Sequence, residues 1–164
     1  MTKTRTMIAL FSAAMTAAVL SVSAAAESKG IVILHTNDIH CGINATDDTF
    51  GYAELAAYRA KLESEGYSTI LVDAGDFSQG DVVGTLSDGG YIIDIMNELQ
   101  YDAAIPGNHE FDYGIDRFYE LVDMAEFDVI SSNFVSLETD STVLDGTTII
   151  EAAGVTVGLV GIST

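Results

Sequence analysis

Three short polar clusters contain the residue types that bind divalent metal ions. The first cluster holds Asp38 and His40, the second holds Asp76, and the third holds Asn108 and His109. Carboxylate and amide oxygens combined with imidazole nitrogens suit Zn, Mn, Fe or Co better than Ca. A carboxylate has two oxygens and can bridge two cations about 3.5–4 Å apart, as in two-metal hydrolases. The clusters therefore predict a hydrolytic metal centre.

Each cluster begins directly after an apolar run that predicts a strand, at residues 31–34, 70–72 and 103–105. Open α/β sheets bind ligands at the carboxyl ends of their strands, so we expect the clusters to converge in one crevice. Residues i and i+2 of extended backbone point to the same side, which would let Asp38 and His40 contact one ion. Gly75 permits a tight turn that aims Asp76.

Helical patterns alternate with these strands. Apolar spacing predicts helices over residues 52–65, 92–99 and 115–125, and further strands over 129–130, 148–151 and 155–162. Strand–helix–strand repetition indicates an α/β fold with a largely parallel sheet. The last run is apolar at almost every position and requires cover on both faces. We therefore expect this chain to end inside a fold.

The first 26 residues have the design of a secretory signal peptide. Lys3 and Arg5 precede an apolar run over 7–20, and small residues follow over 21–26. The run is shorter than the roughly 18–20 residues that span a bilayer. We expect cleavage near residue 26, no stable membrane span afterwards, and export to the periplasm, the cell surface or the medium.

The charge balance is strongly acidic, with 25 acidic and six basic side chains and a formal net charge of −19. Binding to a nucleic-acid backbone needs clustered Lys and Arg, so this class of partner is excluded. The field of the protein would repel an anionic substrate, although bound divalent metals would reverse the sign locally. Many of the acids are expected to form a solvated surface.

Two further residues have simpler interpretations. Cys41 is the only cysteine, so no intrachain disulfide can form, and its place beside His40 is read as incidental to the chemistry. His35 lies on the first strand and is expected to be a buried hydrogen-bonding residue. Gly75 and Gly80 have the spacing of a phosphate-binding loop, but Asp81 stands where that motif requires Lys.

The motifs D-x-H, G-D-x-x-x-G and G-N-H-E, in this order, resemble those of the calcineurin-like metallophosphoesterases. The wider blocks 33–40, 72–80 and 107–114 are similar to the branch of bacterial 5′-nucleotidases, UDP-sugar hydrolases and cyclic-nucleotide phosphodiesterases. The similarity covers residues 30–164. It implies a sandwich of two β-sheets flanked by helices, of which this chain would supply the first half.

The resemblance also implies a role for each polar residue. Asp38 and His40 would bind one metal, Asp76 would bridge two, Asn108 would bind the second, and His109 would contact the phosphate with Asp112 orienting it. The implied cofactors are two divalent ions, of Mn, Zn, Co or Fe. The implied partner is a small phosphate ester such as a nucleotide, attacked by a metal-activated hydroxide.

The chain departs from the family pattern in two ways. Cys41 replaces the glycine that commonly follows D-x-H, and no histidine follows His109, whereas the family draws further ligands from later motifs. Residues 27–164 are thus expected to be the N-terminal part of a truncated catalytic domain that lacks the C-terminal nucleotide-binding domain. Two functions stay open: a phosphoester hydrolase of 5′-nucleotidase type, or an inactive fragment that binds at most one metal. A cyclic-nucleotide phosphodiesterase, UDP-sugar hydrolase or thiosulfohydrolase on the same scaffold is a third reading.

Overall fold

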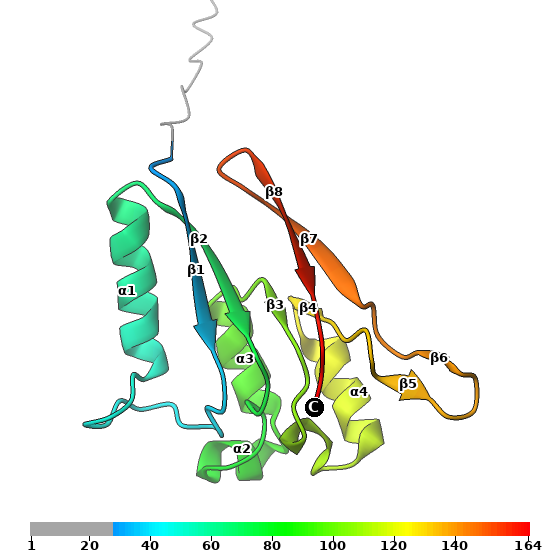
Figure 1. Ribbon diagram of the computed structural model, residues 1–164. Coiled ribbons are helices and arrows are strands. Elements are labelled where there is room, and N and C mark those ends of the chain that lie inside the picture. The colour runs from blue at the N-terminus through cyan, green and yellow to red at the C-terminus, as the bar shows by residue number, and fades with distance from the viewer. Residues whose placement is uncertain (1–27) are drawn as a thin grey trace, which may run out of the picture.

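A parallel sheet carries the three polar clusters (Figure 1). The computed structural model describes residues 28–164, so the leader expected at residues 1–26 lies outside the described residues. The four strands run in the order β1-β2-β3-β4, and each pair is parallel. Their bounds are β1 Ile31–Thr36, β2 Ser68–Asp73, β3 Ala103–Ala104 and β4 Asp128–Val129.

Helices cover one face of this sheet. They are α1 Tyr52–Ser64, α2 Val82–Ser87, α3 Gly90–Glu98, the short 3₁₀ helix η1 His109–Phe111, and α4 Ile115–Met124. One apolar cluster joins α1, α3 and α4 to strands β2 and β3, with Ile92, Ile93 and Met96 of α3 almost fully buried. Burial of such side chains removes apolar area from water and is the main source of stability. Among residues 28–164, no helix combines the length and the apolar character that crossing a bilayer requires.

Two hairpins follow the parallel sheet. They consist of β5 Val135–Ser136 with β6 Ser141–Thr142, and β7 Thr147–Ala152 with β8 Val155–Val160. Ala153 and Gly154 both have positive φ, at 51° and 74°, as a two-residue hairpin turn requires. Strand β7 contacts β2 of the parallel sheet. Val155 and Val160 are 52% and 67% exposed, so residues 28–164 do not cover both faces of β8.

The predicted α/β class and parallel sheet are confirmed, whereas the expectation for His35 is wrong. His35 is exposed, as is Ile33 two positions earlier on the same face of β1. The helices cover the opposite face, where Leu34 packs against the core. Strand β1 also lies at the end of the sheet order, with only β2 beside it in the described chain. His35 therefore does not belong to the core. The apolar character of this strand does not mean that both of its faces are buried.

Candidate metal centre

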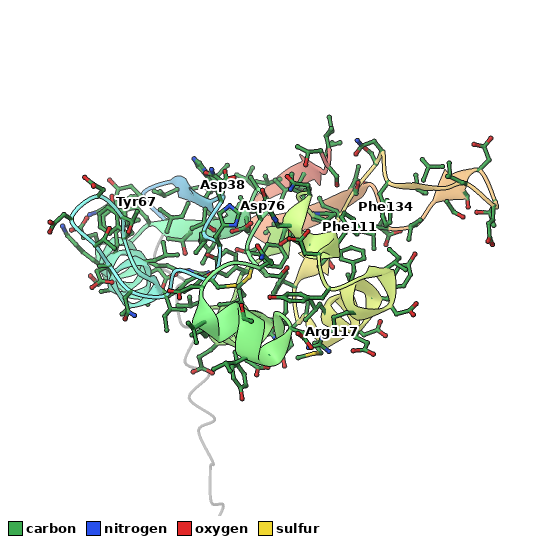
Figure 2. The ribbon with its side chains drawn as sticks, turned by 90° about the horizontal axis from the view of Figure 1, so that it is seen from below. Asp38, Tyr67, Asp76, Phe111, Arg117 and Phe134 are labelled. Atoms are coloured by element: carbon green, nitrogen blue, oxygen red, sulfur yellow. The ribbon has the colours of Figure 1, made fainter. Side chains whose placement is uncertain are left out.

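The three predicted clusters meet at the carboxyl ends of β1, β2 and β3. The first loop donates two backbone hydrogen bonds to the second, from Asp38 N to Gly75 O and from His40 N to Asp76 O, each 2.9 Å. The third loop reaches the second through His109 N, which donates to Asp76 Oδ1 at 2.9 Å. Figure 2 looks along the sheet from this end and labels Asp38 and Asp76 on neighbouring loops. The expected convergence is confirmed.

Three side chains from the three loops gather around one point. One ligand atom each of His40, Asp76 and His109 lies within 4.8 Å of the others, and all three residues are half-buried. The rings of His40 and His109 are edge to face, with centroids 4.9 Å apart. Two nitrogens and a carboxylate oxygen form a mixed set that first-row divalent metals accept. This is the one such group among the residues that the structure describes.

His40 has the orientation expected of a metal ligand. Its Nδ1 lies 3.1 Å from the carbonyl oxygen of Gln79. A carbonyl can only accept, so Nδ1 carries the proton and neutral His40 keeps its lone pair on Nε2. Ligating histidines commonly donate their second ring nitrogen to such an acceptor, which fixes the ring. The donor set around His40 therefore fits a divalent cation.

Asp76 is held by tight backbone packing. Its φ of +61° is in the left-handed region, and Gly75 before it has a φ of +101°. A Cβ on Gly107 would lie 2.3 Å from Asp76 Oδ1, so only glycine fits at that position. Since Oδ1 accepts from His109 N, the remaining oxygen of Asp76 is free to bind an ion. The hydrogen bond and the close packing thus fix the orientation of the Asp76 carboxylate.

His109 forms the contact with Asp112 that the resemblance implies. Its Nδ1 lies 2.7 Å from Asp112 Oδ2. This hydrogen bond raises the pKa of His109 above its ordinary value. Desolvation lowers the pKa by a smaller amount, and the negative charges of Asp112, Asp76 and Glu110 raise it further. A protonated imidazole cannot bind a metal, but it can donate to a phosphate oxygen. The pair with Asp112 therefore favours a contact between His109 and phosphate over ligation.

Replacing Asp112 by Asn should lower the pKa of His109 toward the ordinary value near 6.5. Because the pKa of His109 is higher in the folded chain than in the unfolded chain, protonated His109 stabilises the fold. This stabilisation is fully present when the pH is below the unfolded-state pKa, and it is lost as the pH rises through the folded-state pKa. The variant should lose this pH-dependent part of its stability. NMR titration of the His109 ring measures the shift, with Asp116→Asn on the first turn of α4 as a control. Equal midpoints in both variants would contradict the assigned contact.

Asp38 does not join the group of His40, Asp76 and His109. Asp38 and Asn108 are both exposed, and Asp38 Oδ2 accepts a hydrogen bond of 2.6 Å from Asn37. The expectation of extended backbone here is wrong, because Asp38 and His40 have φ values of +50° and +48°. Alternation of side chains therefore does not apply to them. The proposed metal contacts of Asp38 and Asn108 stay predictions.

Comparison with known proteins assigns the chain to a family. The family model for calcineurin-like phosphoesterases matches residues 31–160, which include all three loops of the centre. The chain belongs to the calcineurin-like phosphoesterase family. The match spans most of the sequence and agrees with the parallel sheet and its helices.

Similar proteins include several nucleotidases. The snake venom 5′-nucleotidase of Crotalus adamanteus is 36% identical over 124 residues, which is 69% of this chain and 21% of that protein. A 2′,3′-cyclic-nucleotide 2′-phosphodiesterase/3′-nucleotidase of Haemophilus influenzae is 29% identical over 123 residues, covering 66% and 19%. The crystal structure of a 5′-nucleotidase precursor from Thermus thermophilus superposes with a TM-score of 0.71 at 26% identity, covering 80% and 28%. The chain thus spans about one fifth of the curated relatives' length.

Cys41, which directly follows His40, lies in the apolar core. It is fully buried, and its Sγ donates to Phe77 O at 3.3 Å. Burial raises the pKa of the thiol to about 11, so Cys41 stays neutral and does not offer a thiolate. A Cβ on Gly84 would lie 2.2 Å from Sγ, which shows how closely α2 packs against it. Cys41 is thus a packing residue.

Two buried acids were not assigned a role from the sequence. Asp73 accepts hydrogen bonds from the Thr36 hydroxyl at 2.5 Å and from Gly75 N at 2.7 Å, and burial raises its pKa to about 7. Glu110 is 1% exposed and contacts the second loop. Asp73 directly follows the predicted strand 70–72, and Glu110 directly follows Gly107-Asn108-His109. That position is the signal in the sequence that could have identified them.

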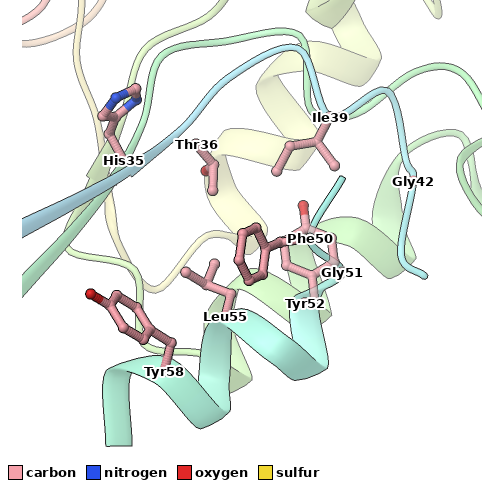
Figure 3. A pocket seen from close by; sticks show the side chains of 9 residues that line it. All are labelled: His35, Thr36, Ile39, Gly42, Phe50, Gly51, Tyr52, Leu55 and Tyr58. Atoms are coloured by element: carbon pink, nitrogen blue, oxygen red, sulfur yellow. The ribbon is translucent and has the colours of Figure 1, made fainter. Parts of the chain in front are cut away.

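An apolar pocket of about 400 Å³ lies beside the first loop (Figure 3). Its lining comes from β1, the following loop and α1: His35, Thr36, Ile39, Gly42, Phe50, Gly51, Tyr52, Leu55 and Tyr58. The Tyr52 hydroxyl is buried and has no hydrogen-bond partner among the described residues, and burial raises its pKa. A neighbouring hollow shares part of this lining and reaches Asp38.

Proposed function

We propose that this chain carries part of the active site of a metal-dependent hydrolase that releases phosphate from nucleotides or similar phosphate esters. The observation that supports it most is the group of His40, Asp76 and His109 at the carboxyl ends of three strands. In both histidines Nδ1 is engaged by an oxygen, which leaves Nε2 for a cation or a substrate. The names of the similar nucleotidases support a nucleotide as the substrate class.

Each residue has a proposed task. His40 and Asp38 would hold one cation, Asp76 would contact two, and Asn108 would hold the second. When bound, such cations polarise phosphoryl oxygens and lower the pKa of a bound water. Protonated His109 would donate from Nε2 to a phosphate or leaving-group oxygen, while Asp112 keeps its ring oriented and charged. Cations and His109 would offset the acidic charge of the chain where an anionic substrate binds.

A second candidate function is metal binding without turnover. It is favoured by the position of Asp38, which is exposed and lies outside the group of three side chains. With only His40, Asp76 and His109 in place, the centre would hold one cation. A single cation does not clamp both the attacking and the leaving oxygen of the reaction.

Phosphate release decides between the two functions. The full chain is incubated with a nucleoside 5′-monophosphate and Mn²⁺ or Co²⁺, and free phosphate is measured with and without a chelator. We expect phosphate release that requires the metal and stops when chelator is added. A 2′,3′-cyclic nucleotide tests the related reaction in parallel, with the nucleoside monophosphate formed by ring opening as the measured product. Saturable metal binding with no hydrolysis of either substrate would contradict the hydrolase and support the second function.

A further inference from the structure

Glu110 is the most deeply buried charged side chain of the described residues, at 1% exposure. A buried carboxylate is costly unless donors replace the water that it loses. Five donors do so here. Oε1 accepts from Phe77 N at 2.9 Å, and from Ser78 N and Ser78 Oγ at 3.0 Å. Oε2 accepts from Asp76 N at 2.8 Å and Gly107 N at 2.7 Å.

Three of these donors are consecutive backbone N–H groups of the second loop. Successive backbone N–H groups in a turn that includes a left-handed residue form a concave anion-binding nest, and Asp76 has a positive φ. In this molecule the nest over residues 76–78 is filled by a carboxylate of the third loop. A free phosphate therefore has no access to it while Glu110 is in place.

Glu110 also fixes the distance between the second and third loops. Its Oε2 binds one N–H from each of them, at Asp76 and at Gly107. The same loops meet a second time where His109 N donates to Asp76 Oδ1. The backbone of Asp76 is thus held from one side and its side chain from the other. Glu110 and the hydrogen bond from His109 thus tie the two loops together at Asp76.

We propose that Glu110 is a positioning residue, which holds Asp76 in the left-handed conformation that turns its carboxylate toward His40 and His109. A non-glycine residue in this conformation carries a strain that the hydrogen bonds of Glu110 offset. The proposal rests on the proposed function only insofar as the positioned group binds a metal. The arrangement of the loop itself is independent of that function.

Glu110→Gln is the sharpest variant, because it keeps the size of the side chain and removes its charge. Both carboxylate oxygens accept at least two bonds, so either orientation of the amide turns its NH₂ toward backbone N–H groups. At least two hydrogen bonds are lost. Bonds to a charged group are worth enough to change an equilibrium roughly 10- to 100-fold.

Amide hydrogen exchange of the full chain, followed by NMR without metal, tests the positioning directly. We expect exchange in Glu110→Gln to rise roughly 10- to 100-fold at residues 76–78 and at Gly107. Amides of the β1–β2 ladder should keep their rates. Calorimetric titration with Mn²⁺ should show a dissociation constant about 10- to 100-fold higher, since supporting residues of metal ligands have effects of this size. Glu98→Gln, exposed at the end of α3, should change neither quantity.

Glu110→Asp keeps the charge on a shorter side chain and should restore part of both effects. Unchanged exchange at residues 76–78 in Glu110→Gln would overturn the proposal. Equal acceleration of loop and ladder with unaltered Mn²⁺ affinity would also overturn it, since that outcome is purely structural. If Glu110→Gln does not fold, Ser78→Ala is used instead, because it removes one of the five donors. Faster amide exchange confined to the second loop in Ser78→Ala supports the proposal. Uniform or unchanged exchange contradicts it. If the unaltered chain binds no Mn²⁺, the proposed function fails while exchange still decides the role of Glu110.

Discussion

Asp76→Asn should abolish metal-dependent phosphate release, with a loss of at least roughly 100-fold. The substitution keeps the shape of the side chain but removes the charge that faces His40 and His109. Even residues that only support metal ligands cost 10- to 100-fold in affinity or activity when changed, and a bridging ligand should cost more. Asp76 Oδ1 also accepts from His109 N, so an inverted amide would place NH₂ against that N–H.

Phosphate release from a nucleoside monophosphate in the presence of Mn²⁺ measures this effect. Asp94→Asn is a matched control, because Asp94 is exposed on α3 and lies away from the three loops. The control should retain the rate of the unaltered chain. A rate for Asp76→Asn equal to that of the control would remove Asp76 from the centre.

Gly107→Ala should weaken Mn²⁺ binding about 10- to 100-fold, although it changes no ligand. A Cβ at this position would lie 2.3 Å from Asp76 Oδ1 and 2.8 Å from Asp76 N. Both contacts are far shorter than van der Waals distance, and backbone N cannot move as easily as a side-chain end. The Asp76 carboxylate must turn away, and its hydrogen bond from His109 N is lost. Overpacking of this kind should also lower the free energy of unfolding by about 1–3 kcal/mol.

Calorimetry with Mn²⁺ measures the affinity, and urea denaturation measures the stability. Gly158→Ala serves as control, because a Cβ at Gly158 of β8 would meet no atom within 4 Å. Its metal affinity should equal that of the unaltered chain. If Gly107→Ala binds Mn²⁺ as tightly as Gly158→Ala, the close packing of Gly107 does not position Asp76.

Most of the sheet could be predicted because its strands are short apolar runs that end at polar turns. The runs at 31–34 and 70–72 became β1 and β2, extended by one to two residues at their ends. Helix α2 was not predicted, since it is only six residues long and contains Gly84, which has a low helix propensity. The two-residue strands β5 and β6 are too short to show a periodic pattern.

The centre was predicted in part, and its two misses have different physical causes. His40, Asp76 and His109 were found because each follows a strand, and strand ends converge whatever the details of the loops. The side chain of Asp38 depends on φ angles that the sequence does not reveal, and the alternation assumed for it fails in left-handed backbone. Glu110 acts through hydrogen bonds to residues more than 30 positions earlier, which no local pattern displays.

The most direct test of the metal centre is a calorimetric titration of the full chain with Mn²⁺, run beside His40→Ala. His40 offers Nε2 to the centre while Gln79 O holds Nδ1, so its removal takes away a ligand without breaking a core contact. We predict saturable binding in the unaltered chain and a loss of at least roughly 100-fold in affinity for His40→Ala. Equal titration curves for the two proteins would contradict it.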